Sequence, residues 1–257
     1  MESSDKGYSD LSFFRDWMKI QEEDLLELHQ ALELNADGGD HTVELKRLAE
    51  KNIAHFQEYA TTRRRLARDD VSSFFSPSWC SSFEGSMLWV GGCRPSIFIR
   101  LVYALSGKEF ESNLREYLQG RRIGGGLGDL SANQIRLING LHLKTVGLED
   151  KLSSKLASLQ EDMADEPIAS IAQESRGHGP PSRAVNEALS THDDSMVNLM
   201  EEADNLRLCT MKELISILTP FQAVAFLAGG KKLHLCLHEW GVLRDHEHGR
   251  HWRMSGN

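Results

Sequence analysis

The sequence predicts an all-α protein, a multi-helix bundle with long antiparallel helices. Three observations support this fold class. Apolar residues recur at three- and four-residue spacing over long stretches, as they do on one face of a helix. The 257 residues include only 6 prolines and 21 glycines, so helix breakers are sparse. Alternating strand patterns never exceed a few residues, and no internal repeat occurs.

The first part of the chain predicts a pair of helices. The first is expected over Ser9–Leu34, with Ser9 or Ser12 as its cap, and the second over Thr42–Arg68. Between them, residues 35–40 read Asn-Ala-Asp-Gly-Gly-Asp, which breaks the helical pattern. A short polar connection of this kind favours an antiparallel hairpin of helices.

Residues 71–107 differ in composition from the segments before them, because tryptophan and phenylalanine are interspersed with proline and glycine. This composition predicts short helices with tight corners. Gly91-Gly92 is expected to form a corner that excludes a side chain, with Pro95 starting the next helix. Two helices are then predicted, a buried one over 96–105 and a short one over 109–118.

A glycine-rich loop is predicted over residues 120–129, and long helices follow it. Ser131 is the candidate cap of a helix that continues to about Asp162 and is bent or ended by Pro167. A surface loop over residues 174–182 then leads to the next long helix, over Arg183–Leu218.

Pro220 suits the first turn of a last helix, which is expected to end near Trp240 and to allow a kink at Gly229-Gly230. The chain therefore divides into three predicted parts: a disordered N-terminus over 1–10, a helical domain over 11–243, and a flexible histidine-rich tail over 244–257.

Composition excludes several classes of protein. The net charge of −9 argues against a protein whose whole surface binds the phosphate groups of nucleic acid. No apolar run approaches the roughly 20 residues that span a bilayer, and the polar, acidic start of the chain is not a secretory signal. The 4 cysteines form no CxxC pair, which is typical of a reducing compartment.

Motifs for catalysis are absent from the sequence, so an enzyme is not expected. Neither HExxH nor GxSxG occurs, and the IGGGLGD run at 123–129 lacks the strand and the lysine of a phosphate-binding loop. The cluster of Arg63, Arg64, Arg65 and Arg68 is interpreted as a solvated helix end, with a weak nuclear import signal or an anion contact as the alternatives.

The most informative pair of residues is His234 and His238, which stand four apart on one face of the last predicted helix. That spacing suits two ligands of one metal ion. Haem fits differently, because one face of a helix cannot easily supply ligands to both sides of a porphyrin; one histidine would be the axial ligand. Spacing alone favours a third interpretation, a pair of partly buried, hydrogen-bonded histidines. The tail at 245–251, Asp-His-Glu-His-Gly-Arg-His, is interpreted as solvated.

Four segments resemble the delay-of-germination domain of plants, in the same order and across roughly residues 10–244. They contain MLWVGGCRPS, SLQEDMADEPIA, EADNLR and AGGKKLHL followed by HEWG, and lie at residues 87–96, 158–169, 202–207 and 228–241. The same domain forms the C-terminal half of TGA-type bZIP transcription factors. The chain is similar to the stand-alone seed-dormancy regulators, because it carries no bZIP segment.

The resemblance implies an α-helical, mostly nuclear, non-enzymatic regulator of seed dormancy or abscisic-acid signalling. It implies haem binding, with His234 and His238 at the matching positions of the LHxxxHEWG motif and iron as the metal. It also implies self-association and binding of protein phosphatases of the abscisic-acid pathway. The expected location is the nucleus, with the cytoplasm as a further site.

The segment that the family ties to phosphatase binding departs from its pattern here. The matching residues include Phe14, Asp16 and Trp17, but Arg15 replaces an apolar residue and a leading acid is lost. This departure weakens the expectation of phosphatase binding. The alternative is that Phe14 and Trp17 form the core face of the first helix.

A competing hypothesis is a helical interaction module that works with bZIP factors or co-regulators and needs no haem. In neither case is sequence-specific DNA binding by the chain itself expected, because no basic helix precedes a zipper and the only dense basic cluster is at 63–68.

Overall fold

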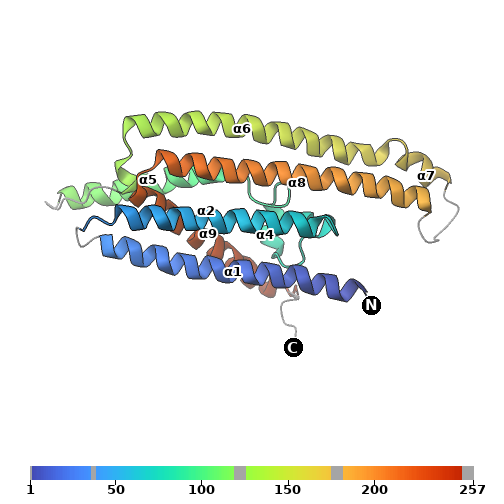
Figure 1. Cartoon of the computed structure of the whole chain (residues 1–257), viewed down its shortest axis with the longest axis horizontal. Helices are drawn as coiled ribbons and strands as arrows, with labels where there is room; N and C mark the ends of the chain where they lie inside the picture. Colours follow the sequence, from blue (N-terminus) through green and yellow to red (C-terminus); the bar gives the residue numbers. More distant parts are fainter. Residues whose placement is uncertain (1, 36–38, 119–125, 175–181, 251–257) are drawn as a thin grey trace.

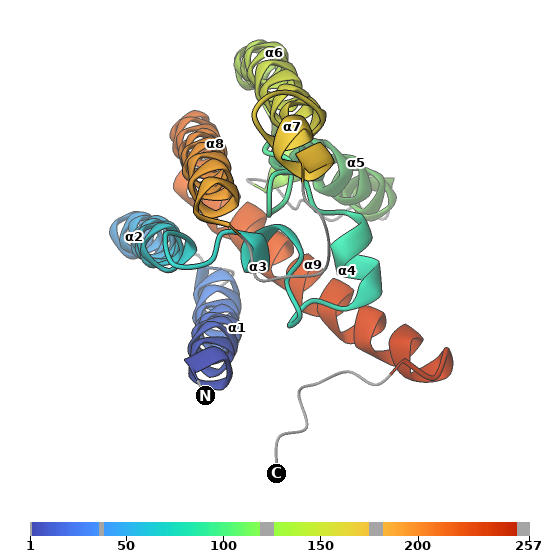
Figure 2. The ribbon, with the colours of Figure 1, turned by 90° about the vertical axis from the view of Figure 1, so that its right-hand side faces the viewer.

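The computed structural model describes residues 2–35, 39–118, 126–174 and 182–250, and all regular elements in these ranges are helical. The all-α prediction is confirmed. The long helices lie side by side and each runs antiparallel to its neighbour (Figures 1 and 2). In spatial order they are α1 (Glu2–Asn35), α2 (Thr42–Ala67), α8 (Arg183–Ile217) and α6 (Ala132–Glu161).

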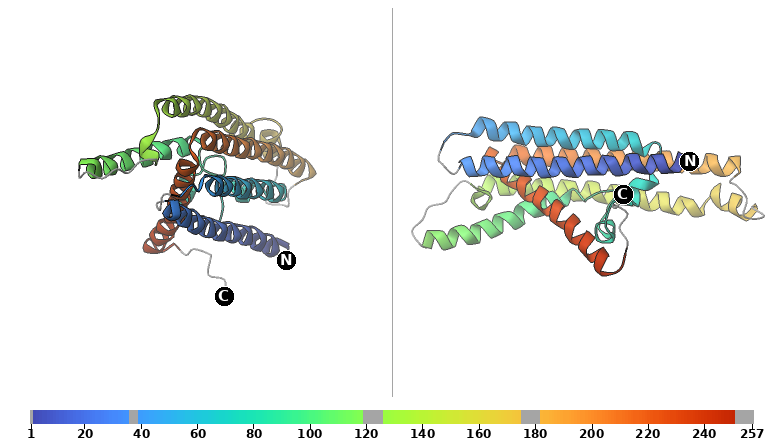
Figure 3. Two further views of the ribbon diagram at one scale, coloured as in Figure 1. Left: turned by 60° about the vertical axis from the view of Figure 1, so that its left-hand side comes forward. Right: turned by 90° about the horizontal axis from the view of Figure 1, so that it is seen from below.

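The last helix, α9 (Pro220–Glu247), crosses this layer obliquely (Figure 3). It packs on α1, α2, α4 (Ser82–Ser86) and α5 (Ser96–Leu118). Short elements fill the connections, namely α3 (Ser72–Phe75), the 3₁₀ turns η1 (Leu127–Asp129) and η2 (Asp162–Ala164), and α7 (Ile168–Glu174). None of the described helices is both long and apolar enough to cross a membrane.

The predicted helix starts in the second half of the chain are confirmed. Ser131 accepts a hydrogen bond from the amide of Gln134, whose side chain returns to the Ser131 amide in a capping box. Thr219 caps α9 in the same way, and Pro220 occupies its first turn. These caps satisfy amides that have no partner within the helix.

The predicted corner at Gly91-Gly92 is also confirmed. Gly91 has a φ of +64°, and a Cβ there would lie 2.8 Å from the carbonyl oxygen of Phe74. A Cβ on Gly92 would lie 2.9 Å from Cζ of Arg207. An isolated antiparallel bridge between Trp89 and Gly92 closes the corner, and α5 begins directly after Pro95.

Three expectations about helix boundaries were wrong. Residues 96–118 form one helix instead of two, and this helix passes through Gly107. The first helix begins at Glu2 rather than Ser9. The sequence allowed a kink at Gly229-Gly230, and helix α9 continues through both glycines; a Cβ on Gly229 would lie 2.6 Å from Cδ1 of Leu105 in α5.

The third boundary concerns the end of α9, which continues to Glu247 beyond the expected end near Trp240. Asp245 explains the extension: its side chain is buried and its Oδ2 accepts a hydrogen bond of 2.7 Å from the Ser82 amide. Residues 244–247 of the predicted tail are thus helical. The division into three parts otherwise stays a prediction. Much of the predicted glycine-rich loop, the 174–182 loop and the end of the tail fall at 119–125, 175–181 and 251–257, outside the described residues.

The main hydrophobic core lies where α9 and α5 meet the layer of long helices. Its fully buried side chains come from α1, α5, α6, α8 and α9, and include Leu28, Ile99, Ile138, Leu214 and Val224. A second cluster joins Phe14 of α1 to Phe74 and Trp79.

Candidate functional site

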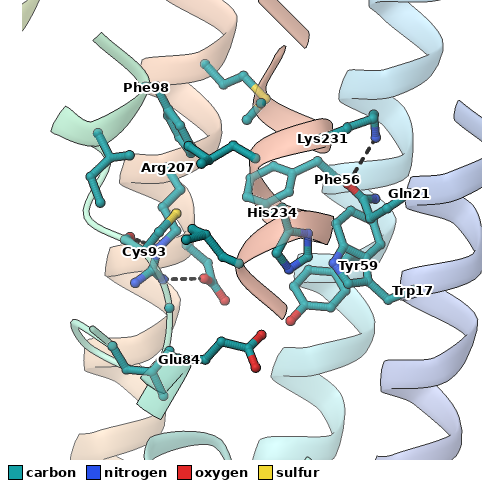
Figure 4. A pocket seen from close by; sticks show the side chains of 18 of the residues that line it. Trp17, Gln21, Phe56, Tyr59, Glu84, Cys93, Phe98, Arg207, Lys231 and His234 are labelled. Carbon is teal, nitrogen blue, oxygen red and sulfur yellow. Dashed lines mark hydrogen bonds and ion pairs between the residues drawn. The ribbon is translucent and has the colours of Figure 1, made fainter. Parts of the chain in front are cut away.

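A cavity of about 350 Å³ lies between α1, α2, the Gly91-Gly92 corner, α5, α8 and α9 (Figure 4). Its volume falls in the range of roughly 300–1,000 Å³ that is usual for small-molecule sites. Most of its surface is apolar. The cavity lies where α9 crosses the long helices, and aromatic side chains of α1 and α2 line it.

Aromatic residues of α1 and α2 form one wall of the cavity. The rings of Trp17 and Tyr59 are stacked, with centroids 4.2 Å apart, and Phe56 lies 6.4 Å from each of them. Burial raises the pKa of Tyr59, so its phenol stays protonated at neutral pH. The wall offers flat apolar faces on which a ring can pack.

His234 of α9 points into the cavity toward Tyr59 (Figure 4). Burial lowers the pKa of His234 from 6.5 to about 4, and the nearby charge of Glu84 only partly opposes this effect. Its imidazole is therefore neutral at physiological pH. A neutral imidazole in an apolar cavity has the protonation state that a metal ligand needs.

His238, one turn further along α9, is held by a carboxylate. Its Nδ1 lies 3.0 Å from both carboxylate oxygens of Glu84, and its ring packs edge-on against Phe14 at 5.5 Å. Desolvation works to raise the pKa of Glu84, but hydrogen bonds from His238 and Ser81 outweigh it and the pKa is lowered. Glu84 is thus ionised at neutral pH, so Nδ1 of His238 carries the proton that it donates.

Lys231 occupies the turn of α9 before His234, and its ammonium group is buried against α1. It donates to Oδ2 of Asp24 at 2.9 Å and to Oε1 of Gln21 at 3.1 Å, and lies 5.9 Å from the centroid of Trp17. Burial lowers the pKa of Lys231, with the charge of Asp24 acting in the opposite direction. The ion pair joins the end of the cavity to the α1–α9 contact.

The opposite side of the cavity holds a buried ionic cluster. Arg207 donates to Oδ1 of Asp204 at 2.6 Å and to the carbonyl oxygens of Trp89, Val90 and Cys93. Arg63 donates to the same Asp204 oxygen at 3.0 Å and to the Gly91 carbonyl at 2.7 Å. The cluster therefore ties α2 and α8 to the corner. This corrects the interpretation of Arg63 as part of a solvated helix end.

The other three arginines of the cluster differ in how far they are free to contact a partner. Arg64 pairs with Glu201 at 2.6 Å, while Arg65 and Arg68 are exposed. Burial of Arg63 removes one of the four positive charges that the sequence places there. Arg65 and Arg68 are therefore the exposed cations of this cluster.

The structure separates the three residues predicted to bind a partner. Phe14 is buried, Trp17 is partly buried in the aromatic wall, and only Asp16 is exposed. Phe14 and Trp17 thus line the cavity together with His234. This arrangement agrees with the alternative hypothesis from the sequence, in which Phe14 and Trp17 form the core face of the first helix.

Several residues at the site were missed from the sequence, namely Gln21, Asn52, Tyr59, Glu84 and Lys231. Lys231 could have been found, since it lies three residues before His234 and hence on the same helical face. Glu84 and Asn52 come from distant segments whose approach to α9 no local pattern indicates.

A multidentate metal site is not assembled in the part of the chain that the structure describes. No cluster of three or more histidine, cysteine, aspartate or glutamate side chains with metal-binding geometry occurs there. Burial raises the pKa of Cys80 to about 12, which keeps this cavity-lining thiol protonated and poorly nucleophilic. Fold and site together define a helical protein with a mostly apolar cavity and a neutral histidine that lines it.

Comparison with known proteins identifies the family. The model of the DOG1 family, described as seed dormancy control, matches residues 24–104. The chain is 40% identical to Protein DOG1-like 3 of Arabidopsis thaliana over 240 residues, which cover 91% of this chain and 84% of that protein. Protein DOG1-like 1 of the same plant is 40% identical over 252 residues, covering 91% and 89%. The chain belongs to the DOG1 seed-dormancy-control family.

A more distant similarity links the chain to transcription factors. Transcription factor TGA6 of Arabidopsis thaliana is 27% identical over 212 residues, which cover 82% of this chain and 57% of that protein. The resemblance to both groups that the sequence motifs indicated is thus confirmed.

Proposed function

We propose that this protein is a non-enzymatic regulator that acts through protein–protein contacts in the nucleus, with the cytoplasm as a further location, and binds haem through His234. The DOG1 family supports a role in seed dormancy, and the similarity to TGA6 supports a nuclear setting. The observation that carries the haem proposal is the neutral, partly buried imidazole of His234, which lines an apolar cavity.

The donor chemistry fits one axial ligand. His234 presents a neutral imidazole next to aromatic walls, which suit the faces of a porphyrin. His238 is committed to Glu84 and is not among the residues that line the cavity. When bound, haem would supply an iron centre that can change its oxidation state and ligation. The cations lining the cavity are paired with protein groups, so His234 and the apolar walls would provide the binding energy.

A haem titration of single variants tests this assignment. We expect His234→Ala to weaken haem binding at least tenfold and to change the Soret band, because the axial ligand is lost. His238→Ala should have a smaller effect, since His238 would act by packing beside Phe14 and holding Glu84. His29→Ala, at an exposed histidine of α1, is the matched control and should bind as wild type.

Two results would contradict the proposal. Equal haem affinity of wild type and the His234→Ala/His238→Ala double variant would remove the site. A larger loss in His238→Ala than in His234→Ala would move the axial ligand to His238. Circular dichroism of each variant establishes that the helical fold is intact before the affinities are compared.

Phosphatases of the abscisic-acid pathway are proposed as partners, and the exposed residue Asp16 gives the test. If the first helix provides the contact, Asp16→Ala should weaken binding to a purified phosphatase several-fold, measured by calorimetry. Glu22→Ala, at an exposed acid of the same helix, is the control. Unchanged binding in Asp16→Ala would exclude this face as the contact. Self-association stays a prediction, and sedimentation of the purified protein measures it.

A second candidate function is a haem-independent module that works with bZIP factors, and the similarity to TGA6 favours it. Binding of a purified TGA protein by the haem-free chain would support this function. We expect no sequence-specific gel shift with the chain alone at physiological salt. A specific shift that survives competitor DNA would contradict that expectation, and Arg65 and Arg68 would then be the first residues to mutate.

A further inference from the structure

Both ring nitrogens of His234 are open to a ligand. Within the described residues, His234 has no hydrogen bond, ion pair or ring contact. The unpaired polar atoms that the protein covers completely belong to other residues, namely Gln21, Asn52, Arg64 and Asp204. The imidazole therefore keeps accessible surface, and it points into the cavity (Figure 4). A neutral imidazole has one N–H donor and one acceptor nitrogen, so the cavity is offered one of each.

The charges around His234 favour an uncharged ligand. The negative charge of Glu84 acts on His234, so an anionic group placed against the imidazole would meet this carboxylate. The ammonium group of Lys231 also acts on His234, and a cationic group would meet it in turn. Glu84 is already paired with His238 and Lys231 with Asp24, so neither is free to neutralise a charged ligand.

The volume and the walls of the cavity set the shape of the ligand. An apolar cavity of roughly 150 Å³ takes up benzene, so about 350 Å³ accommodates a molecule of two fused rings. The stacked side chains of Trp17 and Tyr59 provide a flat wall for such rings. Water would be held poorly, because a buried water needs two to four polar partners and the walls are mostly apolar.

We propose that the cavity binds an uncharged aromatic alcohol of about two fused rings, whose hydroxyl bonds to the imidazole of His234 and whose rings pack on the Trp17–Tyr59 wall. A hydroxyl both donates and accepts, so it pairs with either nitrogen of a neutral histidine. An analogue without the hydroxyl leaves the imidazole unpaired, which gives the site its selectivity. This ligand is distinct from haem, and the two would exclude each other because they share His234.

Three probes separate the contributions of the rings, the hydroxyl and charge. 2-Naphthol carries an uncharged hydroxyl at pH 7, 2-methylnaphthalene has the same rings and nearly the same size without it, and 2-naphthoate carries a negative charge. Each is titrated into the haem-free full chain at pH 7, and calorimetry or naphthyl fluorescence measures the affinity. We expect 2-naphthol to bind and 2-naphthoate to bind about tenfold more weakly, because its charge meets Glu84 and loses water.

The ratio of the 2-naphthol affinity to the 2-methylnaphthalene affinity reports the hydroxyl contact, because both probes bury the same rings. In His234→Leu this ratio should fall about tenfold, since the hydroxyl then enters an apolar cavity without its partner. The affinity of 2-methylnaphthalene itself should not fall. His29→Leu, at an exposed histidine of α1, is the matched control and should keep the wild-type ratio.

A second pair of variants tests whether the rings occupy the cavity. Gly230 of α9 lines the cavity, and a Cβ there would lie 3.7 Å from Cδ2 of Leu101, which is an ordinary contact. Gly230→Leu should therefore fill part of the cavity and weaken 2-naphthol and 2-methylnaphthalene alike. Gly147→Leu adds the same side chain on α6, where a Cβ would meet nothing within 4 Å, and should bind both probes as wild type does.

The proposal is overturned if 2-naphthol does not bind, if 2-naphthoate binds more tightly than 2-naphthol, or if folded His234→Leu keeps the wild-type ratio. Unchanged affinities in folded Gly230→Leu would place the rings elsewhere and overturn it as well. Circular dichroism establishes folding, and the Gly230 pair and the naphthoate comparison decide if His234→Leu does not fold. All probes are measured without haem, so their failure leaves the haem assignment to its own titration, and a failed haem titration leaves this proposal unaffected.

Discussion

The two sides of the cavity differ in how completely their buried polar groups are paired. On the α8 side, all three guanidinium nitrogens of Arg207 donate to protein acceptors, and Oδ2 of Asp204 is the atom of this cluster without a partner. On the α1–α2 side, Gln21 and Asn52 each leave one polar atom unpaired. A network that is almost completely paired holds segments together. The α8 side therefore fixes the position of the cavity more firmly than the α1–α2 side does.

The largest expected effect comes from breaking the paired side at Arg207. Arg207→Met leaves Asp204 with one cation and strips three carbonyl oxygens of a donor. Removing one partner of a buried ionic cluster costs about 3–5 kcal/mol. Urea unfolding should show this loss, and Arg136→Met, at an exposed arginine of α6, should stay within about 0.5 kcal/mol of wild type. A loss below about 1 kcal/mol in Arg207→Met would contradict a structural role.

A smaller effect is expected from crowding the corner that Arg207 grips. Gly92→Val places a side chain where a Cβ already lies 2.9 Å from Cζ of Arg207. Overpacking of this kind costs about 1–3 kcal/mol, so the melting temperature should fall by several degrees. Gly147→Ala is the control. A Cβ at this helical glycine would meet nothing within 4 Å, so the substitution adds a methyl group without crowding. A Gly92→Val protein that keeps its stability but loses a partner would instead make this corner a binding surface.

The histidine of α9 that lines the cavity should affect the pH dependence of stability. The pKa of His234 is about 4 in the folded protein and near 6.5 when exposed. Between these values the unfolded chain binds more protons, so acidification from pH 7 to pH 5 should destabilise the fold, by about 2 kcal/mol from this residue. His234→Leu should remove that part of the slope in urea unfolding at the two pH values. An unchanged slope would show that His234 is accessible to protons.

The smallest effect on stability is expected at Asn52, on the side of the cavity formed by α1 and α2. Asn52→Leu removes an unsatisfied oxygen together with the bond to the Leu48 carbonyl, two changes of opposite sign. Its free energy of unfolding, measured with urea, should stay within about 1 kcal/mol of wild type. If instead this variant loses as much stability as Arg207→Met, the difference between the two sides of the cavity disappears.

Much of the local structure was predictable because its causes are local. The caps at Ser131 and the first turn at Pro220 follow from side chains that bond to amides three residues away. The corner at Gly91-Gly92 follows from the conformational demands of glycine. Helix ends that depend on distant partners were not predictable: α9 reaches Glu247 because Asp245 bonds to the Ser82 amide.

The candidate site divides in the same way. The spacing of His234 and His238 placed both on one face of a helix, and the structure agrees. Their environments differ, because Glu84 arrives from another segment to hold His238 while His234 is left facing the cavity. The burial of Arg63 could likewise not be predicted from the sequence, since its partner Asp204 lies 141 residues away in the chain.

The sequence by itself thus determined the helical class, the main helices, the cap at Ser131, the first turn at Pro220 and the histidine pair, since helical periodicity and short-range hydrogen bonding depend on neighbouring residues. Only the tertiary structure decided which polar groups are paired, which histidine lines the cavity and that a cavity exists. These properties arise where α9 crosses α1 and α2, and burial at such a crossing depends on side chains from segments far apart in the chain.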